Sequence, residues 1–205
     1  MKTNQTKPKA VRNLVESFYD SGRGLRSKEL KNYTSGDHNH PGFESLVMKV
    51  LTSAMTEAGI DSHRWEINGD YFNPEDKEWE DPQRLDHHVW IDGKCVLLVE
   101  DRAWIDKPFY TLKRAVVRNM MTLPYVREKL HDDVRFIIVA LAIDIKSRLI
   151  RTLDQTMGFG SRVDHFSLSP YRRGHKGGNY FDHGMNKPEF DRLWSSLVEH
   201  FGRFV

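Results

Sequence analysis

Residues 134–143 (VRFIIVALAI) constrain the fold of this chain more than any other segment. They are almost wholly apolar and rich in β-branched side chains, and eight apolar residues follow one another from Phe136 to Ile143. A strand without alternating polar residues is typical of one that is buried on both faces of a sheet. The apolar run is too short to cross a bilayer as a helix. The segment therefore predicts a strand at the centre of a mixed sheet.

Other segments with helical or strand patterns surround this strand. Residues 85–91 and 95–99 flank Asp92-Gly93, which is a strong signal for a hairpin turn, so we expect them to form an antiparallel hairpin. Helices are predicted at 10–19, 43–58, 108–129, 145–157 and 190–201, and further strands at 64–67 and 163–168. This order predicts an α/β fold in which a central mixed β-sheet is flanked by helices.

Length and composition favour one domain. The chain has 205 residues, of which 39% are hydrophobic and 29% charged, which excludes a charge-dominated disordered chain. Its single cysteine, Cys95, excludes an intrachain disulfide and a multi-cysteine zinc site. The N-terminus lacks the apolar core of a secretory signal. We therefore expect a single cytoplasmic domain over 1–205, with a disordered basic tail at 1–10 and no contact with membranes.

The charges are nearly balanced but unevenly distributed. There are 31 basic and 29 acidic residues, and the acids gather between Asp70 and Asp86. Basic residues gather on or before the expected helix at 108–129, where they would contact nucleic-acid phosphates or, equally, form a solvated helix face. These residues are Lys107, Lys113, Arg114 and Arg118.

The stretch 169–188 is Gly-rich, basic and aromatic, and we expect it to be a loop that contacts DNA. Arginine and lysine can read guanine edges and asparagine can read adenine, whereas glycines allow close approach to a backbone. The candidate contact residues are Tyr171, Arg172, Arg173, His175, Lys176 and Asn179. The alternative is an ordinary surface loop.

Two acids and an arginine on the expected hairpin stand out as candidates for chemistry. On an extended strand Glu100 and Arg102 face the same side, and Asp86 lies on the preceding strand across the turn. Carboxylates are ligands that Mg²⁺ prefers, and a bound Mg²⁺ would polarise a phosphodiester and hold an attacking water. The alternative is a surface ion pair between Glu100 and Arg102.

The hairpin register decides which acids can meet. A two-residue turn at Asp92-Gly93 would pair Asp86 with Val99 and place Asp86 on the wrong face. A three-residue loop, a bulge or splayed strands would instead place Asp86 beside Glu100. Asp101 alternates with Val99, so we expect it on the opposite face and rank it below Glu100 as a ligand.

Two histidines follow Asp86 directly. Because neighbouring residues of a strand face opposite ways, His87 and His88 cannot easily both bind one metal ion with Asp86. We expect one of them to be buried and hydrogen-bonded and the other to be solvated.

This arrangement resembles the PD-(D/E)xK nuclease superfamily, and within it the type II restriction endonucleases. The resemblance covers about residues 43–143 and implies a core made of a helix, a three-stranded antiparallel piece, a helix and a further strand. It also implies that Asp86 and Glu100 bind the metal ion, that Arg102 stands where the family has lysine, and that Glu44 adds a catalytic acid.

The sequence departs from the family pattern at two positions. Leu85 replaces the proline before Asp86, and Arg102 replaces the lysine. An arginine keeps its proton, so Arg102 could orient a water molecule or stabilise negative charge but could not act as a general base.

The resemblance implies a Mg²⁺-dependent, sequence-specific endonuclease of double-stranded DNA from a restriction-modification system. It would act as a homodimer and leave 5′-phosphate and 3′-hydroxyl ends. One alternative is a junction-resolving or repair nuclease, and another is a nuclease-like domain that binds DNA without cutting it.

Overall fold

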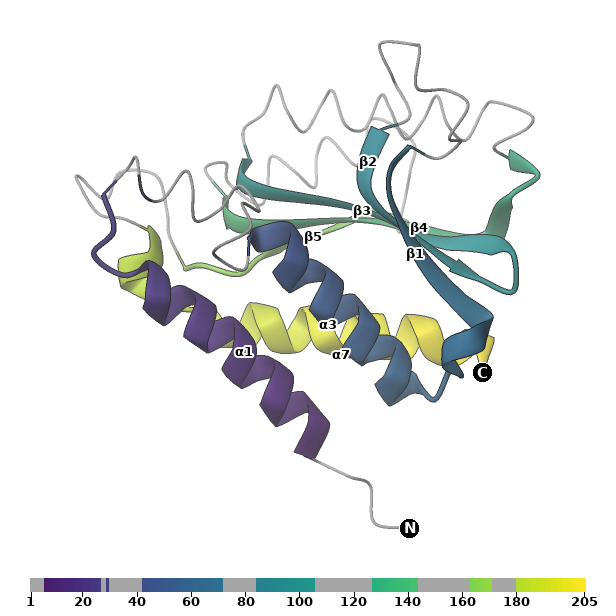
Figure 1. The fold of residues 1–205 in the computed structure, drawn as a ribbon, viewed down its shortest axis with the longest axis horizontal. Coiled ribbons are helices and arrows are strands. Elements are labelled where there is room, and N and C mark those ends of the chain that lie inside the picture. Colours follow the sequence, from purple (N-terminus) through teal and green to yellow (C-terminus); the bar gives the residue numbers. More distant parts are fainter. Residues whose placement is uncertain are drawn as a thin grey trace.

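A mixed β-sheet forms the framework of the protein (Figure 1). The computed structural model describes residues 6–26, 29, 42–71, 84–105, 127–143, 163–170 and 180–205. The five strands of the sheet follow one another in chain order, β1-β2-β3-β4-β5. The pairs β1–β2 and β2–β3 are antiparallel, whereas β3–β4 and β4–β5 are parallel. The predicted α/β fold with a central mixed sheet is confirmed.

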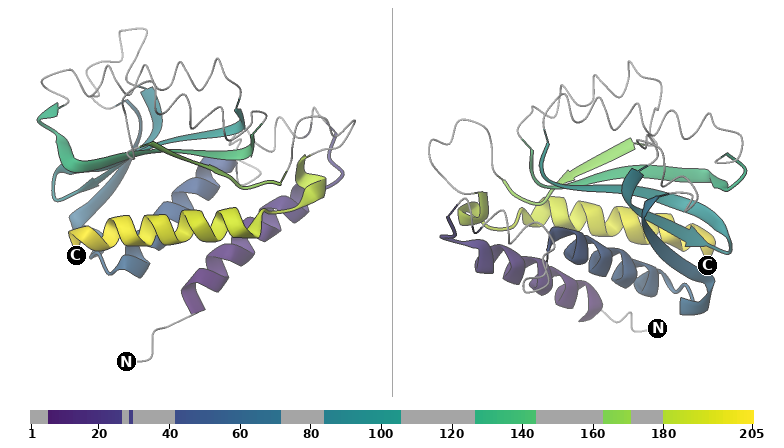
Figure 2. Two further views of the ribbon diagram at one scale, coloured as in Figure 1. Left: turned by 180° about the vertical axis from the view of Figure 1, so that it is seen from behind. Right: turned by 45° about the horizontal axis from the view of Figure 1, so that its top comes forward.

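The strands and helices have the following bounds. The strands are β1 (Trp65–Tyr71), β2 (Arg84–Ile91), β3 (Lys94–Ile105), β4 (Leu130–Ile143) and β5 (Val163–Ser167). The α-helices are α1 (Thr6–Gly22), α3 (Phe43–Ala58) and α7 (Lys187–Phe201). Short 3₁₀ turns are η1 (Ser62–Arg64), η4 (Tyr180–His183) and η5 (Gly202–Phe204). These three α-helices of the described ranges lie on one face of the sheet (Figures 1 and 2).

Strand β4 is the buried strand that the sequence predicts. Phe136 and Ile137 point to opposite faces of the sheet, and their side chains are only 2% and 1% exposed. The same burial continues along the strand to Leu141. The β-branched apolar run thus packs against neighbours on both faces, as expected for an inner strand of a largely parallel region.

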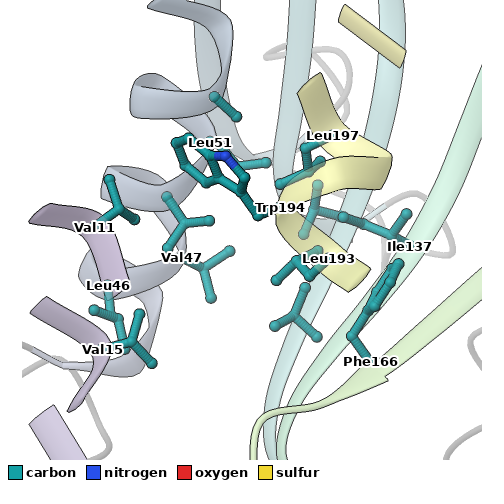
Figure 3. Packing of buried hydrophobic residues seen from close by; sticks show 14 of the residues in the cluster. Val11, Val15, Leu46, Val47, Leu51, Ile137, Phe166, Leu193, Trp194 and Leu197 are labelled. Atoms are coloured by element: carbon teal, nitrogen blue, oxygen red, sulfur yellow. The ribbon is translucent and has the colours of Figure 1, made fainter. Parts of the chain in front are cut away.

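The apolar core lies between the sheet and the helices (Figure 3). Leu51 of α3 and Trp194 of α7 meet there, and Ile137 and Phe166 come from the sheet. Helix α3 presents its buried residues at helical spacing and ends at Gly59, which adopts the left-handed conformation that glycine tolerates best. This packing places the start of α3 on the face of the sheet that carries Leu97 and Val99 of β3.

Two helices begin earlier than the sequence pattern suggested. Helix α1 begins at Thr6, so residues 6–10 are helical and do not belong to a disordered tail. Helix α7 begins at Lys187, inside the stretch expected to be a loop. Both first turns contain a proline, Pro8 and Pro188, whose fixed φ suits the start of a helix. An ion pair between Glu16 and Lys187, 2.7 Å from Oε1 to Nζ, joins these two helices.

Several predictions lie outside the described residues. They include the helix expected at 145–157 and most of the helix expected at 108–129. The residues expected to contact DNA lie there too, namely Lys107, Lys113, Arg114, Arg118, Tyr171, Arg172, Arg173, His175, Lys176 and Asn179. None of the helices in the described ranges is long and apolar enough to span a bilayer.

Candidate metal centre

The hairpin that carries the candidate site closes with a two-residue turn. Ile91 pairs with Lys94, and the residues between them both have positive φ, 49° at Asp92 and 77° at Gly93. That combination is the turn whose twist matches antiparallel strands, and glycine and aspartate tolerate it best. Both nitrogens Nε and Nη2 of Arg64 donate to the Asp92 carboxylate, at 2.7–3.2 Å, and so tie the turn to the chain before β1.

A β-bulge at Val96 changes the register of this hairpin. Trp90 pairs with Cys95, but the next pair is Val89 with Leu97, so Val96 is an extra residue in β3. Beyond the bulge His87 stands opposite Val99. Among the three routes that the sequence left open, the structure therefore shows the bulge. The Val96 carbonyl accepts a hydrogen bond from Nε2 of His200 in α7 at 2.9 Å.

A second bulge lies on the other side of β2. Asn68 pairs with His88 and Asp70 pairs with Leu85, so Gly69 alone stands opposite both Asp86 and His87. Bulges re-aim the side chains that they carry and are frequent beside functional sites. Here the bulge removes Asp86 from the regular alternation of β2 at the point where its pairing with β3 ends.

Three carboxylates from three elements come together beside this bulge. Glu44 in the first turn of α3, Asp86 of β2 and Asp101 of β3 each offer a ligand oxygen, and these oxygens all lie within 4.8 Å of one another. Glu44 is exposed, Asp86 is half-buried and Asp101 is buried. We call Glu44, Asp86 and Asp101 the carboxylate cluster. Its all-oxygen donor set could hold a hard divalent cation.

Hydrogen bonds fix the two carboxylates that come from the sheet. The backbone N–H of Asp101 donates to Oδ2 of Asp86 at 2.7 Å. Nε2 of His87 lies 2.8 Å from Oδ2 of Asp101, and both of these side chains are 4% exposed. An ionised carboxylate only accepts hydrogen bonds, so the imidazole is the donor in this pair. Asp86 and Asp101 are thus held in fixed positions, while Glu44 reaches the cluster from the helix.

Burial and repulsion make Asp101 a poor anion unless a cation is present. Burial raises the pKa of Asp101 to about 6, the hydrogen bond from His87 opposes this shift, and the nearby charges of Asp86 and Glu44 add to it. A carboxyl whose pKa is raised by burial and by like charges gains most from a bound cation. The site is therefore arranged to attract positive charge.

Glu100 does not belong to the carboxylate cluster. Its neighbours Val99 and Asp101 lie on the helix-covered face, so by alternation Glu100 faces the opposite side of the sheet, with Leu98. The Glu100 side chain is 0% exposed there. The structure thus brings Asp86 and Glu44 together, as the resemblance implied, but with Asp101 in the place expected for Glu100.

For the arginine of the expected motif, Arg102, the structure describes only the backbone. Arg102 lies in β3 opposite Ala140, and its side chain is outside the described part of the structure. The residue two positions after Asp101 is Ala103, so no basic side chain has the spacing of the family's lysine from that acid.

Both histidines that follow Asp86 are buried, at 3% for His87 and 0% for His88. The expectation that one of them is solvated is wrong, because both faces of the sheet are covered at this point of β2. The sequence analysis also did not predict the contact between His87 and Asp101. The sequence signal for this contact is weak: in the observed register His87 and Asp101 are diagonal neighbours on one face, but the bulge that sets the register has no marker residue.

A surface hollow among the described residues lies away from the carboxylate cluster. It has a volume of about 550 Å³ and lies between the start of β4 and the outer face of α7. Asp133, Arg135, Arg192, Glu199 and Arg203 contribute to its walls, and no member of the carboxylate cluster does. Its guanidinium groups already pair with acids, such as Arg192 with Glu189 at 2.9 Å. The carboxylate cluster therefore remains the stronger candidate site.

No protein-family model and no curated protein matches this sequence.

Proposed function

We propose that this protein is a Mg²⁺-dependent, sequence-specific endonuclease of double-stranded DNA, related to the type II restriction endonucleases. The observation that carries the proposal is the carboxylate cluster, in which a helix and two neighbouring strands contribute acids whose oxygens lie within 4.8 Å. Paired or triple carboxylates of this kind are typical of sites that hold Mg²⁺ against a phosphate-containing substrate.

The order of the elements supports the proposal. Helix α3 is followed by the antiparallel strands β1, β2 and β3, and β4 then runs parallel to β3. The PD-(D/E)xK core, which the sequence resembles, has a helix, three antiparallel strands, a second helix and a further strand, and the second helix, expected at 108–129, lies mostly outside the described residues. The acids of the cluster lie on two consecutive strands and on the preceding helix, as the resemblance implies, but the second strand contributes Asp101 and not the implied Glu100.

The proposed ligands are Asp86 and Asp101, with Glu44 completing the site. Oxygen-only ligands suit a hard divalent cation better than a zinc or copper ion. When bound, such a cation supplies the positive charge that polarises the phosphodiester and offsets charge on the departing oxygen. Asp86 and Asp101 hold their positions through the hydrogen bonds of β3 and His87.

The proposal assigns the second ligand position to Asp101 rather than Glu100. The proposal does not carry over the role that the resemblance implied for Arg102, because residues 100 and 102 alternate with Asp101 in β3. By the same resemblance, a homodimer would cut one strand with each subunit and leave 5′-phosphate and 3′-hydroxyl ends.

The test is cleavage of a long double-stranded DNA with Mg²⁺, with Mn²⁺ and with EDTA. We expect discrete fragments that require the metal ion and that disappear in Asp86→Asn. Asp132→Asn, which changes an exposed acid at the start of β4, is the matched control and should cut normally. Intact DNA under every condition would contradict the proposal.

One observation favours a second candidate, a nuclease-like domain that binds DNA without cutting it. Ala103 stands where the family's lysine would follow Asp101, so the described site lacks a lysine at that spacing. Mg²⁺-dependent DNA binding without cleavage would support this candidate. Preferential cutting of a four-way junction over linear duplex would instead indicate a junction-resolving or repair nuclease.

A further inference from the structure

Strand β5 is the last strand of the described sheet, so only one side of its backbone pairs with β4. The N–H of Leu168 donates to the Ala140 carbonyl at 2.8 Å, so the even-numbered residues of this segment bond toward β4. The direction alternates along a parallel strand, so His165 and Ser167 present their backbone N–H and C=O groups outward. Outward groups of this kind can pair with a strand of another chain.

Helix α7 covers two of these outward groups with side chains. Nη2 of Arg192 donates to the His165 carbonyl at 2.5 Å. The Ser167 N–H donates to Oε2 of Glu189 at 3.5 Å, which is a long hydrogen bond. A further parallel strand would engage the same carbonyl and N–H with the two backbone groups of a single residue. The arginine donor and the glutamate acceptor therefore take the place of one residue of an added strand.

Two further contacts hold Arg192 in this position. Its Nε and Nη2 donate to the Glu189 carboxylate at 3.1 and 2.9 Å, three residues earlier in the helix. Its guanidinium carbon lies 4.1 Å from the centroid of the Phe166 ring, in cation–π geometry, and Phe166 is buried in the core. A guanidinium has five N–H donors in a rigid plane, so it can serve the carboxylate and the His165 carbonyl at once.

We propose that Arg192, oriented by Glu189, caps the outer edge of β5 and so prevents a second copy of this chain from adding a strand to the sheet. The second copy is the relevant partner because it carries the same strand with the same outward backbone groups. This inference goes beyond the proposed nuclease and does not rest on it, because neither residue belongs to the carboxylate cluster.

The test measures self-association of the full-length protein by sedimentation velocity over a range of concentrations. Arg192→Met keeps a long apolar stem over Phe166 and removes every donor. We expect its self-association constant to rise at least about tenfold, because hydrogen bonds of the β5 edge become available to a second copy. Arg192→Lys keeps a charged donor and should stay close to the wild-type constant. An unchanged constant in folded Arg192→Met would overturn the inference.

Arg203→Met is the matched control for the added apolar side chain. Arg203 also pairs with an acid of α7, Glu199, at 3.2 Å, and its side chain is 51% exposed, against 46% for Arg192. Among the described residues its hydrogen bond goes to Glu199 and not to β5. Arg203→Met should therefore keep the wild-type self-association constant. An increase equal to that of Arg192→Met would assign the effect to the methionine and overturn the inference.

Hydrogen exchange locates the contact between the copies. In associated Arg192→Met, the amides of residues 163–167 should exchange more slowly than in the same variant at high dilution. Protection confined to another surface would mean that the copies do not meet at β5, and the inference would fail. It would also fail if a homodimer of the unaltered protein already protects these amides.

A further measurement uses the unaltered protein and does not depend on the folding of any variant. NMR relaxation of the arginine Nε–H groups gives an order parameter for each side chain. We expect a value at Arg192 near that of rigid backbone, about 0.85, and a lower value at Arg203. A value at Arg192 below about 0.6, which is typical of a flexible group, would overturn the inference.

Discussion

Glu100 and Asp101 are neighbours in β3, and both are buried, yet they belong to two different environments. Asp101 lies on the face that the helices cover, where Glu44 and Asp86 approach it. Glu100 lies on the opposite face, at 0% exposure, and takes no part in the carboxylate cluster. The comparison shows that burial alone does not distinguish an acid that meets other acids from one that does not. Convergence with other acids from separate elements is the more informative property.

Two bulges decide which of these acids meets Asp86. The bulge at Val96 sets the register of the hairpin, and the bulge at Asp86 and His87 turns the Asp86 side chain out of the regular alternation. His200 holds the first bulge through the Val96 carbonyl, and His87 supports the second through Asp101. The site thus depends on two local departures from regular sheet geometry, each with a buried histidine beside it.

We expect the largest effect from Asp101→Asn, which changes the one of the two neighbouring acids that belongs to the carboxylate cluster. The amide keeps the size of the side chain but removes the negative charge that a cation needs. DNA cleavage should fall at least about a thousandfold, or ~4 kcal/mol in transition-state stabilisation. Cleavage rates with saturating Mg²⁺ measure this effect, and unchanged circular dichroism serves as the folding control. Full cleavage activity of Asp101→Asn would mean that the metal ion binds on the opposite face of the sheet.

The next effect concerns pH and the histidine at the first bulge. Burial lowers the pKa of His200 to about 4, and its hydrogen bond to the Val96 carbonyl and nearby charges modify this shift. Because the unfolded residue titrates near 6.5, the unfolded state binds the proton first as the pH falls. The contribution of His200 is fully present above pH 6.5 and is lost between pH 6.5 and 4, by up to ~3 kcal/mol. Asp101, whose pKa is raised to about 6, has the opposite effect in this range, so the test is the difference between the two proteins: relative to His200→Phe, the wild-type protein should lose stability to urea as the pH falls from 6.5 to 4.

A smaller effect follows from His200→Phe at pH 7.5, where the wild-type imidazole is neutral. The variant leaves the buried Val96 carbonyl without its donor, and a buried unsatisfied acceptor costs about 1–3 kcal/mol. Urea unfolding measures the loss. If the hydrogen bond also holds the register, Mn²⁺ affinity at the carboxylate cluster should fall with it. An unchanged stability would show that the bulge is held by strand pairing alone.

The sequence predicted the elements far better than their irregularities. The apolar run of β4, the Asp92-Gly93 turn and the stripe of α3 each rest on a local pattern, and each was confirmed. The alternation that groups Asp101 with Val99 was also correct. The sequence did not show which face α3 would cover, because that depends on packing between distant segments. The bulge at Val96 has no glycine or proline to mark it, and Gly69 of the second bulge lies beyond the strand predicted at 64–67, so the meeting of Asp86 with Asp101 could not be predicted.

The smallest effect that we expect comes from Glu100→Gln, which changes the acid on the opposite face of β3. The amide has nearly the same shape as the carboxyl, and residue 100 has no ligand oxygen among those of the carboxylate cluster. Mn²⁺ affinity should therefore stay within about threefold of the wild-type value, less than ~0.7 kcal/mol. Calorimetry at pH 7.5, beside Asp101→Asn, measures the difference. If Glu100→Gln loses as much Mn²⁺ affinity as Asp101→Asn, the metal ion binds on the face of Glu100, and the carboxylate cluster is an incidental gathering of acids.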